Sequence, residues 1–153
     1  MSKFKIYFKS ILIPVIIGGI VGFLISGSMD YDSLVKPPLS PPGFLFPIVW
    51  TILYIFIGVS YGILESNSLI DESSNFIYYF QLFVNALWPF FFFLLKWRLF
   101  SSIWIIFLII LIILMIINFY KKNKISGLLQ IPYLLWSIFA TYLTISIYLL
   151  NRA

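Results

Sequence analysis

The chain has 153 residues, of which 62% are hydrophobic and 10% are charged, and its mean hydropathy is +1.07. Soluble domains carry about 25% charged residues, so this composition excludes a water-soluble globular fold. The formal net charge of +5 comes from ten scattered lysines and arginines beside apolar stretches, where they are expected to anchor lipid headgroups and not to bind nucleic acid.

Five stretches with almost no charged residues are long enough to cross a bilayer as helices, which takes about 20 mostly apolar residues. We expect these spans at roughly residues 8–28, 44–65, 75–95, 99–120 and 127–150. The run 103–117 is almost unbroken Ile, Leu, Phe and Met, whereas barrel strands alternate apolar with polar residues. The sequence therefore predicts an all-α integral membrane protein, a five-transmembrane-helix bundle in which residues 1–153 form one membrane domain.

The amino terminus begins as a signal peptide does, with Lys3, Lys5 and Lys9 before an apolar run. The run continues to Ile25 without a small-x-small cleavage site, which is too long for a signal peptide. We therefore expect it to be the first membrane span.

The first connection, residues 29–43, is rich in proline and holds two Pro-Pro pairs. Such pairs forbid a helix and favour a stiff, extended path. The segment is either a structured lid over the end of the bundle or a rigid linker that separates two helices, and composition alone does not decide between them.

Small residues recur every fourth position in the first two spans, at Gly18, Gly22 and Ser26 and again at Gly58 and Gly62. Such faces let helix backbones approach closely in lipid. Packing within one chain is favoured over packing between two chains, because a five-helix bundle already needs close contacts.

The third and fifth spans carry polar groups and large rings at helical spacing. Gln81, Asn85 and Trp88 share one helical face, and a buried amide costs free energy unless it is hydrogen-bonded inside the bundle. Trp136 and Ala140 pair a large ring with a small neighbour on the last span. These faces indicate either a pocket with aromatic walls for a flat, apolar ligand or an interior filled by its own side chains.

The chain has no cysteine and no histidine, which excludes disulfides, thiol nucleophiles, imidazole haem ligands and the usual zinc sites. Any chemistry must come from aromatic and amide groups. We expect no metal site and no required cofactor.

Four motifs, which together extend over most of the chain in order, resemble one family. They are Lys36-Pro-Pro-Leu-Ser-Pro-Pro-Gly-Phe44, Phe46-Pro-Ile-Val-Trp-Thr-Ile-Leu-Tyr54, Gln81-Leu-Phe-Val-Asn-Ala-Leu-Trp88 and Pro132-Tyr-Leu-Leu-Trp-Ser-Ile-Phe-Ala140. This combination resembles the tryptophan-rich sensory protein (TspO/MBR) family, also called translocator protein or peripheral-type benzodiazepine receptor.

The resemblance implies a five-helix bundle, commonly a homodimer, with a pocket under the first loop that binds porphyrins, sterols and benzodiazepine-site ligands. The ligand-binding residues expected from the motifs and the helical faces are Tyr31, Pro41, Trp50, Tyr54, Gln81, Asn85, Trp88, Phe91, Trp136 and Ala140. According to the resemblance, Pro41 belongs to the lid and Tyr31 closes the pocket.

We therefore expect a membrane receptor or sensor for porphyrins and other flat hydrophobic ligands. One alternative implied by the resemblance is an enzyme that degrades protoporphyrin IX with light and oxygen, with Trp50 and Trp136 as its catalytic residues. The other alternative is a porphyrin or sterol transporter. The expected partners are such a ligand and membrane lipid, and the expected location is a bacterial cell membrane.

Overall fold

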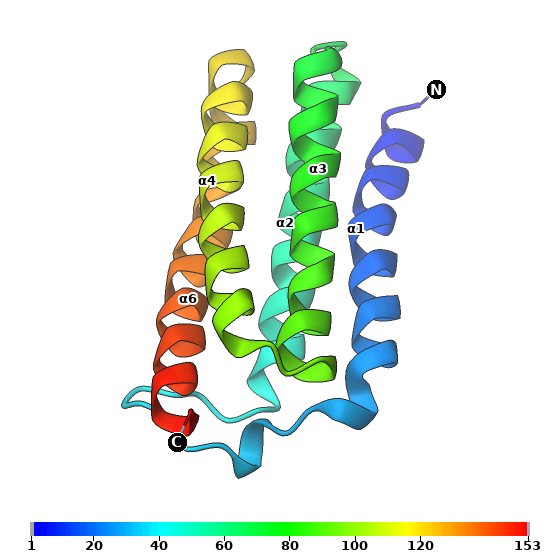
Figure 1. The fold of residues 1–153 in the computed structure, drawn as a ribbon. Coiled ribbons are helices and arrows are strands. Elements are labelled where there is room, and N and C mark those ends of the chain that lie inside the picture. The colour runs from blue at the N-terminus through cyan, green and yellow to red at the C-terminus, as the bar shows by residue number, and fades with distance from the viewer. Residues whose placement is uncertain (1, 153) are drawn as a thin grey trace.

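A computed structural model describes residues 2–152, and within this range every regular element is a helix. Five long helices stand side by side with alternating direction (Figure 1). They are α1 (Lys3–Ile25), α2 (Leu45–Ser66), α3 (Glu72–Pro89), α4 (Arg98–Lys122) and α6 (Ile131–Asn151). Together with the short helices that extend them, all five are long and apolar enough to cross a membrane. The predicted all-α bundle of five membrane spans is confirmed.

Polar side chains cap the helices at the end of the bundle opposite the first loop. Asp71 accepts a hydrogen bond from the backbone N–H of Ser74 at 2.8 Å and so begins α3. Asn123 accepts one from the N–H of Ser126 at 3.0 Å and begins the short helix α5 (Lys124–Leu128). Such caps satisfy N–H groups that have no partner within the helix.

Two irregularities interrupt the predicted spans. After Pro89 the third span continues as a π-helix, η3 (Phe90–Leu94), in which the N–H of Leu95 donates to the carbonyl of Phe90 at 2.9 Å. The last span is broken between α5 and α6, just before Pro132, which lacks a backbone N–H. Both breaks lie beside a proline, as expected where the regular hydrogen-bond ladder loses a donor.

Glycines bring α1 and α2 into direct backbone contact in the half of the bundle that holds the amino terminus. A methyl group added at Gly58 would collide with the carbonyl of Ser10 and would lie 2.5 Å from Cα of Ile11. One added at Gly62 would lie 2.7 Å from the ring of Tyr7. Gly58 and Gly62 therefore pack against another helix of the same chain, which is the arrangement that the sequence analysis favoured over packing between two chains.

We expect Gly58→Ala to lower the free energy of unfolding by about 1–3 kcal/mol, because the new methyl group meets backbone atoms that cannot move aside cheaply. The measurement is a denaturant titration of the purified protein in mild detergent. Gly27→Ala is the matched control, since nothing lies within 4 Å of a methyl group added there. Equal stability of the two variants would contradict the close contact between the helices.

Candidate ligand-binding cavity

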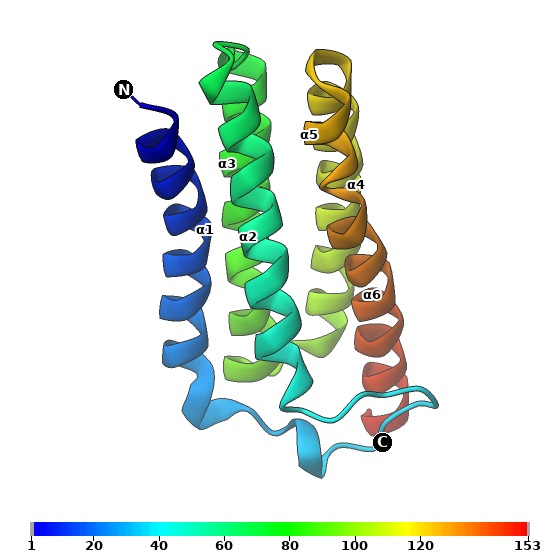
Figure 2. The same ribbon diagram turned by 180° about the vertical axis from the view of Figure 1, so that it is seen from behind.

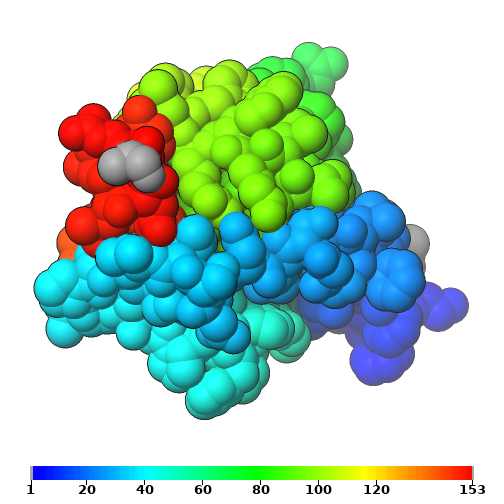
Figure 3. Space-filling model, turned by 60° about the horizontal axis from the view of Figure 1, so that its bottom comes forward, coloured from blue at the N-terminus to red at the C-terminus, as the bar shows by residue number. Residues whose placement is uncertain are grey.

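Residues 29–43, here called the lid, lie across the end of the bundle where α1 ends and α2 begins (Figure 3). Within the lid, the hydroxyl of Tyr31 donates to the carbonyl of Pro41 at 2.7 Å. The hydroxyl of Tyr142 on α6 donates to the carbonyl of Pro38 at 2.7 Å. The lid is therefore a tied structure and not a loose connection.

The end of α6 also pairs with the backbone of the lid. The side-chain amide of Asn151 accepts from the N–H of Val35 at 3.0 Å and donates to its carbonyl at 2.8 Å. These two hydrogen bonds resemble those between paired strands. They satisfy the backbone N–H and carbonyl groups of Val35, which lies outside any helix.

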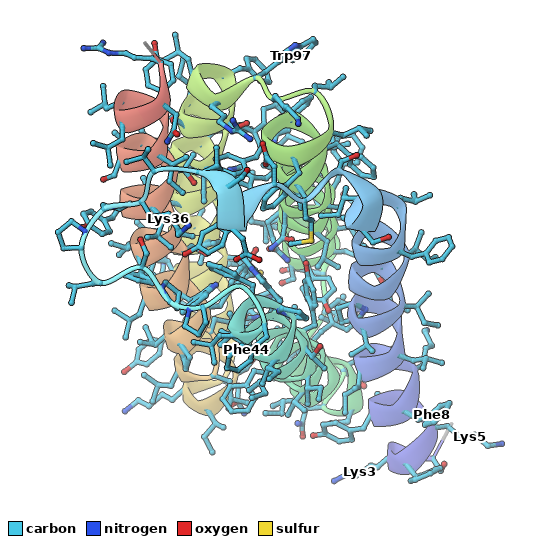
Figure 4. The ribbon with its side chains drawn as sticks, turned by 90° about the horizontal axis from the view of Figure 1, so that it is seen from below. Lys3, Lys5, Phe8, Lys36, Phe44 and Trp97 are labelled. Carbon is cyan, nitrogen blue, oxygen red and sulfur yellow. The ribbon has the colours of Figure 1, made fainter. Side chains whose placement is uncertain are left out.

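Lys36 holds the lid's central turn together from the inside. Its ammonium group donates to the carbonyls of Tyr31 and Leu34, each at 3.0 Å, and to that of Asp32 at 3.3 Å. It also lies 4.9 Å from the centre of the Tyr31 ring, a favourable cation–π distance. Figure 4 views this end of the bundle from outside, with Lys36 inside the curve of the lid.

An ion pair fixes the start of the lid to the connection between α3 and α4. One Nη of Arg98 donates to both carboxylate oxygens of Asp30, at 2.7 and 2.6 Å, and Lys96 Nζ lies 3.5 Å away. Burial alone would raise the pKa of Asp30, but the Arg98 hydrogen bond and the two nearby positive charges outweigh it and lower that pKa. The Arg98 guanidinium also lies 5.1 Å from the centre of the Phe92 ring, which is part of the cavity wall.

Arg98→Gln is expected to loosen the lid. The pair with Asp30 is mostly shielded from solvent, so its loss should cost about 1 kcal/mol, the upper end for ion pairs near a surface. Hydrogen exchange at the amides of Ser33 and Leu34, which are bonded within the lid, should quicken about fivefold. Lys96→Gln is the control and should change exchange less, because Lys96 is more exposed and farther from the carboxylate.

The same pair predicts a pH dependence. Since the pKa of Asp30 is lowered in the folded protein, its stabilising contribution is present above the ordinary pKa of an aspartate and is lost as pH falls through the lowered value. After correction for the intrinsic pH dependence of amide exchange, the protection of the lid amides in the wild type should therefore fall only under acidic conditions. A corrected protection that already fell between neutral pH and pH about 5 would contradict this assignment.

Beneath the lid, the five long helices surround a cavity of about 560 Å³. This is within the range of roughly 300–1,000 Å³ typical of small-molecule sites. The lining residues on the described chain include aromatic, aliphatic, glycine and hydroxyl side chains and one amide, with no charged side chain among them. The cavity therefore favours an uncharged, flat and largely apolar guest, or the apolar body of an amphipathic one.

Seven of the ten residues expected in the site line this cavity. They are Tyr31 from the lid, Trp50 and Tyr54 from α2, Asn85 and Trp88 from α3, and Trp136 and Ala140 from α6. The other three, Pro41, Gln81 and Phe91, are not in its lining. Pro41 accepts the hydrogen bond of Tyr31, and Phe91 packs on the outer side of α3 and α4 with its ring centre 5.0 Å from that of Trp104.

Buried hydrogen bonds join α2, α3 and α6 at the inner end of the cavity. The hydroxyl of Tyr54 donates to Oδ1 of Asn85, and Nδ2 of Asn85 donates to the hydroxyl of Tyr133, both at 2.7 Å. That hydroxyl donates in turn to Oε1 of Gln81 at 2.7 Å, and Nε2 of Gln81 donates to the carbonyl of Tyr78 at 2.9 Å. Gln81 therefore supports the cavity from behind and does not face it.

Two tryptophans in the wall have buried indole N–H groups without a hydrogen-bond partner in the described residues. They are Nε1 of Trp88 and Nε1 of Trp136. Unsatisfied buried donors are rare in folded proteins and call for a specific explanation. Here both belong to the lining of one cavity, where an acceptor on a guest molecule would satisfy them.

Sequence reasoning missed Tyr133, which is fully buried and links Asn85 to Gln81. Its spacing from Trp136 and Ala140 places all three on one helical face, and that pattern could have identified it. Phe92 was missed as well. Its ring stacks on Trp88 with centres 4.9 Å apart and forms part of the wall.

Comparison with known proteins matches the chain to one family. The family model described as TspO/MBR matches residues 10–150. The chain is 39% identical to a tryptophan-rich protein TspO of Archaeoglobus fulgidus, over 93% of this chain and 94% of that protein. It is 36% identical to the protein of the same name in Chlorobaculum tepidum, over 81% and 80% of the two chains. It is also similar to a translocator protein homolog of Schizosaccharomyces pombe, at 28% identity over 96% and 93%.

The matched region begins within the first span and ends near the close of the last, so it includes α2, α3, α4 and the lid, most of α1 and α6, and every residue that lines the cavity. The arrangement of the tryptophans, the buried amide and the proline-rich lid lies within that match. The chain belongs to the TspO/MBR family.

Proposed function

We propose that this protein is a membrane receptor or sensor that binds porphyrins or similar flat hydrophobic molecules in the cavity beneath the lid. The observation that supports this best is the combination of uncharged aromatic walls with the two unpartnered indole N–H groups of Trp88 and Trp136. A relative in Cereibacter sphaeroides carries the name tryptophan-rich sensory protein, at 30% identity.

The walls fit this guest for physical reasons. Trp50, Trp88 and Trp136 lie on three different helices, so a flat ring system in the cavity can contact aromatic surface on several sides. Burial of such surface favours binding by about 25 cal/mol per Å² of apolar area removed from water. The two free indole donors favour a guest with acceptor atoms on its edge, which distinguishes a porphyrin or a carbonyl compound from a plain hydrocarbon.

The test is a titration of the purified protein with protoporphyrin IX, which follows tryptophan fluorescence and the main porphyrin absorption band. The proposal expects saturable quenching with one binding site per chain and a shifted absorption band. Quenching that rises linearly with porphyrin and also occurs in empty detergent micelles would overturn it.

A second candidate function is light-driven degradation of the bound porphyrin, because Trp50 and Trp136 both line the cavity and could contact an excited ring. We expect the double variant Trp50→Phe, Trp136→Phe to bind protoporphyrin within about tenfold of the wild-type affinity, since phenylalanine keeps much of the apolar contact. Illumination in air then separates the functions. Conversion of the porphyrin spectrum by the wild type but not by the variant supports the enzyme, and an unchanged spectrum in both supports the receptor.

The transporter alternative has less support from the cavity. Transport coupled to an ion gradient uses ionisable groups inside the membrane, and no charged residue lines this cavity in the described chain. The relatives include bacterial and archaeal proteins, and we propose the cell membrane of a prokaryote as the location.

A further inference from the structure

The contact between α1 and α2 changes along the length of the two helices. On α2, Pro47, Thr51, Gly58 and Gly62 fall on one helical face, because their spacings are four, seven and four residues. Gly58 and Gly62 meet α1 at backbone distance. Pro47 and Thr51 on the same face are exposed and line the cavity. The face that closes the helix pair in one half of the bundle is therefore open in the half next to the lid.

The facing residues of α1 show the same change. Gly19, Gly22 and Ser26, the last in the short helix η1 (Ser26–Ser28), are exposed and also line the cavity. A methyl group added at Gly19 or Gly22 would have nothing within 4 Å, whereas one added at Gly18 would collide with the ring of Tyr54. In Figure 2, where both helices lie in front, they diverge toward the lid.

These five residues, Gly19, Gly22, Ser26, Pro47 and Thr51, define the α1–α2 crevice, where the cavity lining is exposed at the side of the bundle within two of the candidate membrane spans. Its hydroxyl groups are already bonded within their own helices. Ser26 Oγ donates to the carbonyl of Phe23 at 2.8 Å, and Thr51 Oγ1 donates to the carbonyl of Pro47 at 2.7 Å. The crevice is therefore uncharged and effectively apolar.

The end of the bundle that the lid covers is closed, in contrast to the α1–α2 crevice. Tyr31 is only 6% exposed, and the lid is held to the rest of the chain by Arg98, Tyr142 and Asn151. Opening this end would break several hydrogen bonds and an ion pair at once. Among the described residues, no hydrogen bond or ion pair between the two helices has to break at the crevice, where Gly19 and Gly22 leave space.

We propose that ligands enter and leave the cavity sideways through the α1–α2 crevice, from the hydrocarbon of the bilayer, while the lid stays closed. This inference rests on the proposed function, since it concerns the route to the same cavity. A flat hydrophobic molecule partitions into the bilayer because burial of its apolar surface is favourable there. An opening at membrane depth would let it reach the aromatic walls without first returning to water.

The first arm of the test plugs the crevice from either wall. In lipid nanodiscs, stopped-flow tryptophan quenching by protoporphyrin IX gives association and dissociation rates for Gly19→Phe on α1 and Thr51→Phe on α2. We expect both rates to fall together by at least about tenfold, because one mouth serves both directions. Ile20→Phe and Ile52→Phe are the matched controls on the exposed faces of the same helices and should stay within about twofold of the wild type.

The second arm locks the lid. Cysteines introduced at Val35 and Arg152, next to the paired Asn151, can be joined by a short bis-methanethiosulfonate, and the chain has no cysteine of its own to interfere. The cross-linked protein should bind at the wild-type rate. Association that slows when the lid is locked, or that stays at the wild-type rate in both plugged variants, would overturn the route. A wild type with no saturable binding would instead overturn the proposed function.

Discussion

Replacing Ala140 with phenylalanine is expected to weaken porphyrin binding strongly in a protein that still folds. Ala140 is 7% exposed and lines the cavity one turn beyond Trp136 on α6. A ring at this position would project into the 560 Å³ space and displace a bound macrocycle from the Trp136 side. The apparent affinity in a tryptophan-quenching titration should fall at least about a hundredfold, which corresponds to about 2.7 kcal/mol.

The control for this variant is Leu135→Phe, which adds a ring on the exposed face of the same helix, where Leu135 is 61% exposed. It should bind as the wild type does. Because Ala140 also contacts the core, the thermal midpoint of each variant is measured alongside, and Ala140→Leu provides a smaller substitution with an intermediate loss of affinity. Undiminished binding by a folded Ala140→Phe protein would place the ligand elsewhere.

The second large effect concerns stability. Asn85→Leu is expected to lower the free energy of unfolding by about 2 kcal/mol, because it leaves the buried hydroxyl of Tyr54 without an acceptor and removes the donor to Tyr133. Single hydrogen bonds inside membrane proteins contribute about 0.6 kcal/mol on average, so most of this cost comes from the unpaired hydroxyl. Unfolding in mixed detergent micelles measures the change.

A double-mutant cycle tests that explanation directly. In the Asn85→Leu background, Tyr54→Phe should cost nothing further or restore stability, since it removes the unpaired hydroxyl. In the wild-type background the same change should destabilise by about 1 kcal/mol. Asn67→Leu is the control, because the Asn67 amide donates to the carbonyl of Ile63 at an exposed position after α2, where water can replace the lost partner; it should stay within about 0.5 kcal/mol of the wild type. Additive effects of the two substitutions would contradict the hydrogen bond.

The apolar spans could be predicted from the sequence because a helix in lipid must satisfy its backbone internally and must be about 20 residues long. The contacts that hold the lid in place could not be predicted in the same way. Arg98 and Asp30 are 68 positions apart, and nothing in the sequence around either residue identifies the other as its partner. The sequence left open whether residues 29–43 form a lid or a linker, and only the three-dimensional contacts decide it.

The placement of Phe91 shows a second limit of sequence reasoning. In a regular α-helix, residues three and four positions after Trp88 both lie near its face, so Phe91 and Phe92 are equivalent candidates. The π-helix that starts after Pro89 has a wider turn, and the residue four positions on then stacks on Trp88. Phe92 therefore takes the place in the wall, and Phe91 turns toward Trp104 outside the cavity.

The homodimer implied by the family resemblance remains a prediction. Gly58 and Gly62 already pack against α1 within the chain. Any dimer contact must therefore use other surfaces. Sedimentation of the detergent-solubilised protein at several concentrations would determine the number of chains per particle.

The most direct test of the binding cavity uses the indole N–H resonances of the five tryptophans in a ¹⁵N-labelled sample, with and without saturating protoporphyrin IX. Trp50, Trp88 and Trp136 line the cavity, so their resonances should move, and the unpartnered N–H groups of Trp88 and Trp136 should move most. Trp97 is exposed, and the N–H of Trp104 already donates to the carbonyl of Val84 at 2.7 Å, so these two should stay in place. Shifts confined to Trp97 and Trp104 would contradict the cavity as the binding site.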